Sequence, residues 1–208
     1  MDIISYYSAH SAYAYLGAAE LKRIADRNNA KIVHRPMDLR AVMPAAGSQA
    51  MADRSQAHMD YFFNREIVRW AEERKIPVME GVPTHHANQI HLGNKLLIAA
   101  DQAGLDIDAL SEEMLRAHWV DDADVASVED LTAICHAVDI DAAPLLAQTD
   151  DQDLEALYQS YTDEAIRIGC FGSPTYVVGK DMFYGQDRLS LVERALVKPY
   201  EGTWALIG

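Results

Sequence analysis

Strand-like segments occur only near the two ends of this 208-residue chain, and this placement constrains the fold more than any other feature. "IISYY" (3–7) and "KIVHR" (31–35) are short β-like runs, and segment 12–28 between them has an amphipathic helical pattern. The inner face of that helix is predicted to carry Ala14, Ala18, Leu21 and Ala25. Strand, helix and strand in this order predict a βαβ unit with parallel strands and a right-handed crossover.

Helical patterns fill the middle of the chain. One apolar stripe has helical spacing over 59–71, and a second extends over 92–103. "SVED" (127–130) predicts a capping box at the start of another helix, and a further helix is predicted over 151–168. Because no strand pattern interrupts these segments, we expect an all-helical insertion.

The last part of the chain returns to strands. "PTYVVG" and "MFYG" predict two short strands joined by a turn at 179–181, and Asp187 is predicted to cap a final helix. The complete order is β-α-β, then helices, then α-β-β-α. We therefore expect an α/β fold in which residues 1–40 and 165–208 form one domain, with residues 41–164 as a helical insertion domain.

Composition excludes several classes of function. The formal net charge of -14 argues against a nucleic-acid surface, because phosphate binding needs clustered Lys and Arg. Met1 leads directly into strand-like residues without a signal segment, and no apolar run reaches the roughly 18 residues of a membrane span. Cys135 and Cys170 form no CxxC pair. These features predict a cytoplasmic protein with no membrane or nucleic-acid partner.

Three motifs resemble those of one protein family. "SAYAYLG" (11–17) resembles the SPYxYLG segment of kappa-class glutathione transferases and 2-hydroxychromene-2-carboxylate isomerases. "FGSPTYVV" (171–178) is similar to their FGVPTxxV, and "FYGQDRL" (183–189) to their WGxDRL. "VRWA" (68–71) and Trp119 fall where the isomerases have similar residues. The resemblance covers essentially the whole chain and implies a thioredoxin-like, DsbA-like fold interrupted by a helical domain.

Ser11 is the residue that the resemblance places at the reactive centre. A hydroxyl just before a helix can donate a hydrogen bond to a thiolate, where the helix N-terminus also favours an anion. DsbA-like relatives carry a cysteine here in a CxxC, but this chain reads Ser11-Ala12-Tyr13-Ala14, so disulfide exchange is unavailable and bound glutathione would supply the sulfur. The pattern alone favours a plain helix N-cap for Ser11, and the other two motifs reverse that preference.

The resemblance also implies a cis peptide bond before Pro174, in a loop that faces the first helix. The backbone of Ser173 would then pair with glutathione as an added strand does. The alternative is an ordinary proline at the start of an edge strand.

The resemblance assigns two further groups to glutathione. Tyr184, Gly185, Gln186 and Asp187 would hold its γ-glutamyl end, although an Asp at a helix start is more often a cap. Asp53 and Arg54 align with an Asn-Arg pair that contacts glutathione in the isomerases.

Four positions depart from the family pattern. Asp53 replaces Asn, Met43 replaces Lys, Ala12 replaces Pro, and Ser8 stands where Asp is frequent. These changes predict a divergent member whose substrate choice could differ from that of its relatives.

The activity that the resemblance implies is glutathione-dependent cis-trans isomerisation in naphthalene-type aromatic catabolism. The substrate would be a small aromatic carboxylate, 2-hydroxychromene-2-carboxylate, interconverted with trans-o-hydroxybenzylidenepyruvate by a homodimer. Two alternatives remain open: a kappa-class-like transferase that conjugates glutathione to electrophiles, and a cysteine-less thioredoxin-fold binding module.

Other patterns give weaker hypotheses. No G-x-S-x-G occurs, which argues against a serine hydrolase of that type. His85, His86 and His91 could form a metal site, but their spacing is not that of HExxH. His10 could tune a thiolate or simply be solvated. Cys170 and Cys135 are expected to be structural.

Overall fold

A computed structural model of the protein describes residues 1–49 and 53–207. Four strands, β1 (Ile3–Tyr7), β2 (Ile32–Pro36), β3 (Thr175–Val178) and β4 (Asp181–Tyr184), form a sheet in the order β2-β1-β3-β4. β1 pairs with β2 in parallel, and the other two pairings are antiparallel. The predicted βαβ unit and the terminal β-hairpin are therefore confirmed.

The connecting elements in the described residues are helical. They are α1 (Ala12–Arg27), α2 (Leu39–Ala45), α3 (Gln56–Met59), the π-helical η2 (Asp60–Arg65), α4 (Glu66–Arg74), α5 (His91–Gln102), α6 (Ile107–Val120), α7 (Val128–Ala137), α8 (Ala143–Leu146), α9 (Gln152–Arg167), the 3-10 turn η3 (Gln186–Arg188) and α10 (Leu189–Val197). None of the helices in the described ranges has the length and hydropathy that a membrane crossing requires.

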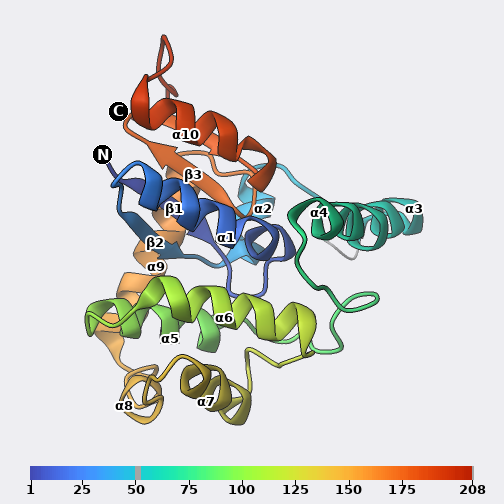
Figure 1. Ribbon diagram of the computed structural model, residues 1–208. Helices are drawn as coiled ribbons and strands as arrows, with labels where there is room; N and C mark the ends of the chain where they lie inside the picture. The colour runs from blue at the N-terminus through green and yellow to red at the C-terminus, as the bar shows by residue number, and fades with distance from the viewer. Residues whose placement is uncertain (50–52, 208) are drawn as a thin grey trace.

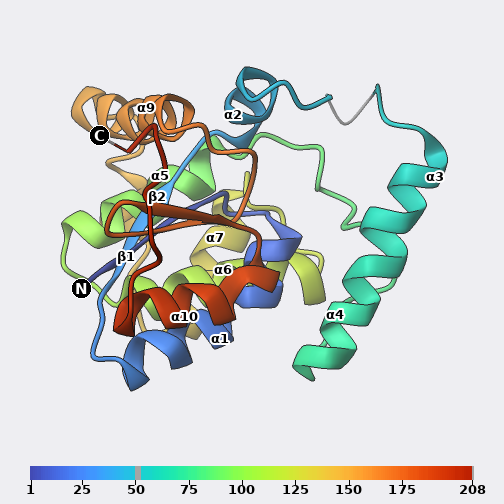
Figure 2. The ribbon, with the colours of Figure 1, turned by 90° about the horizontal axis from the view of Figure 1, so that it is seen from above.

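Helices cover both faces of the sheet (Figures 1 and 2). On one face, α1 and α10 enclose a buried core that includes Ile3, Leu21, Ile24, Tyr176 and Val192. On the other face, α2 and α9 enclose a second core that includes Tyr6, Met37, Val42, Ala165 and Val177. The strands thus bury side chains on both sides, as their apolar sequences predict.

A third and larger core joins the helices to the start of α1. It contains Leu16, Leu97, Met114, Trp119 and Leu131 from α1, α5, α6 and α7. β2 contacts α5 and α9, so the helical middle packs directly on the sheet's edge. The strands fall within 1–40 and 165–208, while the proposed division into two domains stays a prediction.

An arm made of α3, η2 and α4 extends away from the sheet (Figures 1 and 2). Ile67 and Ala71 of α4 are buried and anchor the arm to the third core. The continuous helical stripe predicted over 59–71 is partly wrong, because a π-helical segment interrupts it. π-helical turns are often found at functional sites.

Gly17 permits a close approach between α1 and the turn after β4. A Cβ at this position would lie 2.7 Å from Gln186 Cβ and 3.1 Å from the Tyr176 hydroxyl. Arg74 of α4 donates a hydrogen bond to Gln186 Oε1 at 2.9 Å. The turn is therefore fixed by α1 and by the arm together.

We expect Gly17→Ala to lower the free energy of unfolding by about 1 kcal/mol, measured by urea denaturation. Helix propensity alone would favour alanine by about 1 kcal/mol, but overpacking costs roughly 1–3 kcal/mol. Ala19→Gly, on a partly exposed part of the same helix, measures the propensity contribution separately. A Gly17→Ala protein more stable than the wild type would contradict the close approach.

Candidate active site

Ser11 is the N-cap of α1 and also contacts the loop before β3. Its Oγ accepts a hydrogen bond from the Ala14 N–H at 3.3 Å and donates one to the Ser173 carbonyl oxygen at 3.3 Å. The capping role is therefore confirmed, while the hydroxyl proton is held by a long and weak contact. A helix N-terminus favours anions. An anionic ligand placed here could therefore replace the carbonyl oxygen as the acceptor of the Ser11 hydrogen bond.

The loop that faces Ser11 has the predicted geometry. The Ser173–Pro174 peptide bond is cis. The Ser8 N–H donates a hydrogen bond to Ser173 Oγ at 3.1 Å, so this loop and the β1–α1 connection are joined at two points. Pairing of the Ser173 backbone with a peptide ligand stays a prediction.

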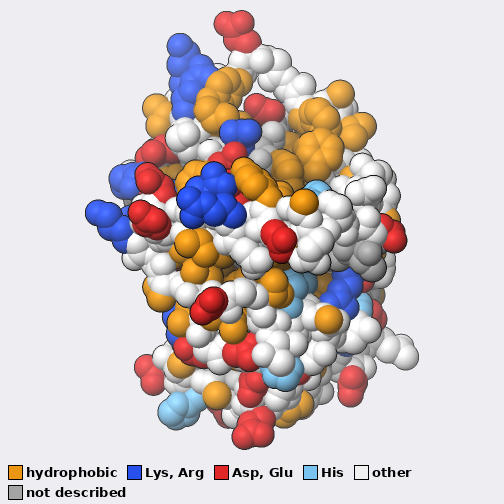
Figure 3. All heavy atoms as spheres, turned by 90° about the vertical axis from the view of Figure 1, so that its right-hand side faces the viewer, with side chains coloured by type: hydrophobic (Ala, Val, Ile, Leu, Met, Phe, Trp, Pro, Cys, Tyr) orange, Lys and Arg blue, Asp and Glu red, His pale blue; other side chains and the backbone are white. Residues whose placement is uncertain are grey.

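A pocket of about 520 Å³ opens beside these residues, a volume typical of small-molecule sites. It brings together four of the predicted site residues: Ser11, Arg54, Ser173 and Tyr184. Its apolar lining includes Tyr13, Met43, Met59, Phe62 and Phe63. On the face that carries the arm, exposed hydrophobic side chains lie among charged and histidine side chains (Figure 3).

The π-helical segment supplies neighbouring aromatic groups to this pocket. Phe62 and Phe63 are consecutive residues, and both line it, with ring centroids 6.1 Å apart. The Phe62 ring also packs edge-on against Tyr13 at 4.9 Å. Tyr13 Oη donates a hydrogen bond to the Phe62 carbonyl at 2.8 Å, which ties the arm to the first turn of α1. The pocket's aromatic wall therefore depends on the arm.

Arg54 brings a cation into the pocket. Its guanidinium lies 5.9 Å from the Phe62 ring centroid. Its Nε is buried and, among the residues that the structure describes, has no hydrogen-bond partner. Burial raises the pKa of Tyr184, and Arg54 partly opposes that shift. A buried donor without a partner is costly, so a carboxylate bound here would satisfy Arg54.

The other predicted site residues do not line the pocket. Asp53 is exposed beside Arg54, Pro174 is buried, and Gln186 is buried under Arg74. Gly185 has a φ of 97°, and a Cβ there would collide with the Asp187 carboxylate. Pro174 and Gly185 are adjacent in sequence to Ser173 and Tyr184, which do line it.

The predicted helix cap at Asp187 is wrong. Asp187 lies inside η3, its carboxylate pairs with Arg188 at 3.0 Å, and no side chain caps η3 or α10. The 3-10 turn moves the start of α10 to Leu189, so Asp187 is too early in the chain to cap it.

A cluster of three histidines lies beside Ser11, and the sequence did not reveal it. The rings of His10 and His86 stack with centroids 4.6 Å apart, and His86 Nδ1 lies 3.0 Å from His118 Nε2. His10 is only 6% exposed and its Nδ1 lies 2.9 Å from Ser8 Oγ, so the solvated alternative for His10 is wrong. His10 and His86 line the pocket.

The remaining candidate groups lie elsewhere. His85 pairs with Asp124 at 3.7 Å, and His91 packs edge-on against Tyr158. Within residues 1–49 and 53–207, no group of three metal-ligating side chains is placed to hold a metal ion.

Burial raises the pKa of Cys170 to about 12 and that of Cys135 to about 11, so neither thiol ionises near neutral pH.

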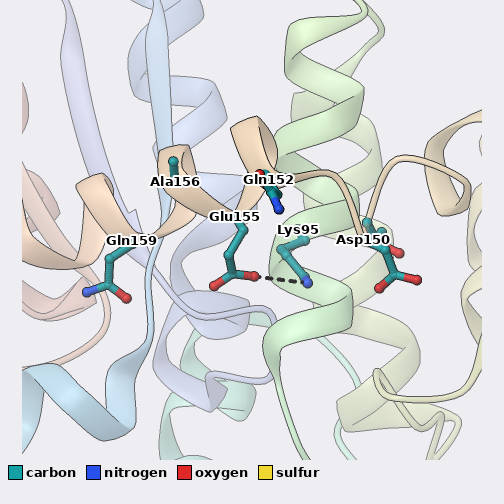
Figure 4. Close-up of a pocket in the computed structure, with 7 residues that line it drawn as sticks. Lys95, Asp150, Gln152, Glu155, Ala156 and Gln159 are labelled. Atoms are coloured by element: carbon teal, nitrogen blue, oxygen red, sulfur yellow. Dashed lines mark hydrogen bonds and ion pairs between the residues drawn. The ribbon is translucent and has the colours of Figure 1, made fainter.

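A second hollow, of about 460 Å³, shares no residue with the pocket at Ser11. It lies between α5 and α9, where Lys95 forms an ion pair with Glu155 at 3.1 Å (Figure 4). Its lining residues are polar or charged apart from Ala156, and its one lysine is already paired with Glu155 (Figure 4). We therefore assign no ligand to it.

The histidine cluster predicts a loss of stability in mild acid. Burial, followed by His118 and Arg40, lowers the pKa of His86 to about 3. An unfolded histidine titrates near 6.5, so between these values the unfolded state binds more protons and stability falls as the pH falls. We expect His86 alone to cost roughly 2 kcal/mol between pH 7 and pH 5.

Urea denaturation of the wild type and of His86→Phe at both pH values measures this effect. The loss between pH 7 and pH 5 should be smaller in the variant, and His85→Phe should behave like the wild type. Equal losses in all three proteins would show that His86 titrates alike in the folded and unfolded states.

Known proteins resemble this chain in sequence and in fold. The chain is similar to 2-hydroxychromene-2-carboxylate isomerase of Sphingobium xenophagum, with 24% identity over 92% of this chain and 96% of that protein. It is likewise 24% identical to the isomerase of Pseudomonas putida, over 94% of each. A solved structure of 2-hydroxychromene-2-carboxylate isomerase superposes with a TM-score of 0.82, at 23% identity and 95% coverage of both chains.

A more distant neighbour has the same fold. The cytosolic disulfide reductase DsbM of Pseudomonas aeruginosa, solved with GSH, superposes with a TM-score of 0.66 at 14% identity, covering 96% of this chain and 94% of that one. A family model of the DSBA-like thioredoxin domain matches residues 2–197. Because this match spans nearly the whole sequence, the chain belongs to the DSBA-like thioredoxin-domain family.

Proposed function

We propose that this protein is a glutathione-dependent isomerase that interconverts 2-hydroxychromene-2-carboxylate and trans-o-hydroxybenzylidenepyruvate. The observation that carries the proposal is a pocket with Ser11 at a helix N-terminus and with Arg54, whose buried Nε has no hydrogen-bond partner among the described residues, in a fold whose usual cysteine is absent. Similarity to two isomerases over more than nine-tenths of the chain supports the reaction.

The residues present suit glutathione. Arg54 offers its guanidinium to a carboxylate, because its buried Nε has no hydrogen-bond partner among the described residues. Ser11 offers a weakly engaged hydroxyl, and the cis loop at Ser173 faces it. Asp187 is exposed, and its carboxylate, which pairs with Arg188, could also pair with an ammonium group. The DsbM structure that contains GSH has the same fold, which adds support.

When bound, glutathione would supply a thiolate that adds reversibly to the conjugated alkene, so that the double bond becomes a single bond, rotates and is restored. Ser11 would donate a hydrogen bond from its hydroxyl to the sulfur and, with the dipole of α1, keep the sulfur ionised. Ser11 would not attack carbon. Cys170 and Cys135 cannot replace this sulfur, because both are buried thiols.

The pocket's walls would hold and dehydrate the aromatic substrate. Phe62, Phe63 and Tyr13 offer ring faces and edges to a flat molecule. Since the protein carries a net charge of -14, long-range attraction does not bring anions to the pocket, and local donors must bind them.

The ultraviolet spectrum of 2-hydroxychromene-2-carboxylate, followed over time with enzyme, tests the function. We expect conversion only when glutathione is present, with the free-thiol titre unchanged. Stoichiometric loss of thiol with an electrophile would instead indicate a transferase. Absence of both conversion and a glutathione-induced thermal shift would favour a binding module.

We expect Ser11→Ala to lower kcat by at least tenfold while changing the Kd of glutathione less than threefold, because the hydroxyl acts mainly on the thiolate. Kinetics and calorimetry measure the two quantities. Ser127 is a matched control, because its Oγ caps α7 by accepting from the Asp130 N–H at 3.3 Å. Both variants should lose roughly 1 kcal/mol of stability.

Only the Ser11 variant should lose turnover. If kcat and affinity fall equally, or if Ser127→Ala loses as much activity, the assigned role of Ser11 is incorrect.

A further inference from the structure

His86 is held firmly in the wall of the pocket. Arg40 donates hydrogen bonds to the carbonyl oxygens of Ala87 and Asn88, at 3.0 and 2.6 Å, which fixes the loop on which His86 lies. Its ring stacks on His10 and contacts the edge of Trp119 at 5.2 Å between centroids. The imidazole therefore presents a fixed edge to the pocket.

The hydrogen-bond chain behind His86 determines which of its nitrogens carries the proton. His118 Nδ1 lies 2.8 Å from the Ala123 carbonyl oxygen, which can only accept, so His118 Nδ1 is the protonated nitrogen. In a neutral His118, Nε2 must then accept a hydrogen bond. The donor is the protonated Nδ1 of His86, 3.0 Å away. In a neutral His86, Nε2 is consequently left with a free lone pair.

Both rings are neutral near physiological pH. Burial lowers the pKa of His118, and it lowers that of His86 to about 3 with help from the neighbouring His118 and Arg40. A second proton on His86 would also face His10, whose pKa burial lowers strongly. His86 is therefore a poor proton carrier but a stable hydrogen-bond acceptor.

The lone pair on His86 Nε2 has no donor among the residues that the structure describes. Among the described residues it makes no hydrogen bond, and it is not one of the buried polar atoms cut off from solvent. Ser11 and Arg54 in the same pocket offer donors, so His86 adds the complementary acceptor. A ligand would need an O–H or N–H group to satisfy it.

We propose that His86 determines specificity by accepting a hydrogen bond from the hydroxyl group of an aromatic acid, which discriminates against analogues that lack this hydroxyl. The inference rests on the proposed function, in which the o-hydroxybenzylidene compound carries an ortho phenolic hydroxyl and the hydroxychromene carries a hydroxyl on the carbon that bears its carboxylate. Discrimination follows because a ligand without the hydroxyl leaves a desolvated acceptor unpaired.

Calorimetric binding of trans-2-hydroxycinnamate and trans-cinnamate tests this inference without glutathione. The two acids differ only in the ortho hydroxyl. We expect the wild type to bind the hydroxylated acid roughly three- to tenfold more tightly, the range for one neutral hydrogen bond. In His86→Phe the ratio should fall to about one, whereas His86→Gln, whose amide oxygen accepts, should partly restore it.

His85→Phe is the matched control, because the neighbouring His85 does not line the pocket, and it should keep the wild-type ratio. Nitrogen-15 spectra of the wild type should show His86 with a protonated Nδ1 and an unprotonated Nε2, whether or not the variants fold.

A wild-type ratio near one, an unchanged ratio in His86→Phe, or a protonated Nε2 would each overturn the inference. If neither acid binds, the inference also fails. The proposed function is tested separately, by whether the wild type converts the chromene when glutathione is present.

Discussion

The pairing of β1 with β3 is the constraint on which the site depends. These strands come from opposite ends of the chain and run antiparallel, with Tyr6 opposite Thr175. Just beyond the paired residues, the chain turns into α1 on one side and into the cis loop on the other. Ser11 thereby meets Ser173, 162 residues away in the sequence. Without this pairing, the hydroxyl would cap a helix and face nothing.

The helical middle adds what the sheet cannot supply. Asn94 on α5 is fully buried; its Oδ1 accepts from the Ala9 N–H at 2.8 Å, and its Nδ2 donates to the Met37 carbonyl at 3.0 Å. It therefore fixes the segment before Ser11 against the core. The arm contributes aromatic side chains, and α6 contributes His118 behind His86. The sheet thus positions Ser11 and Ser173 on one side of the pocket, and the helices supply its walls.

The sequence predicted the elements that local pattern specifies. The strands at 3–7 and the helix from Ala12 follow from alternation and from periodicity, and they agree with the structure to within a residue or two. The cis bond before Pro174 came from the family resemblance rather than from any local pattern. The helix over 59–71 was only partly right, because no simple spacing distinguishes a π-helical turn from an α-helix.

The histidine cluster could not be predicted because its members come from three separate segments. His10 follows β1, His86 lies in a loop, and His118 is on α6, so only tertiary packing brings them together. His85, His86 and His91 suggested a metal site, but the three rings contact different partners. Likewise, Arg54 followed from a family motif, while the burial of its Nε, which has no partner among the described residues, follows only from the packing around it.

We propose that Ser11 and the start of α1 stabilise a thiolate that the protein itself does not provide. The most direct measurement is the pH titration of thiolate ultraviolet absorbance for glutathione bound to the wild type and to Ser11→Ala. We expect the pKa of the bound thiol to lie well below the roughly 8.5 of a free thiol in the wild type and to rise in the variant. If the pKa of the bound thiol equals that of the free thiol in both proteins, Ser11 and α1 do not stabilise the thiolate.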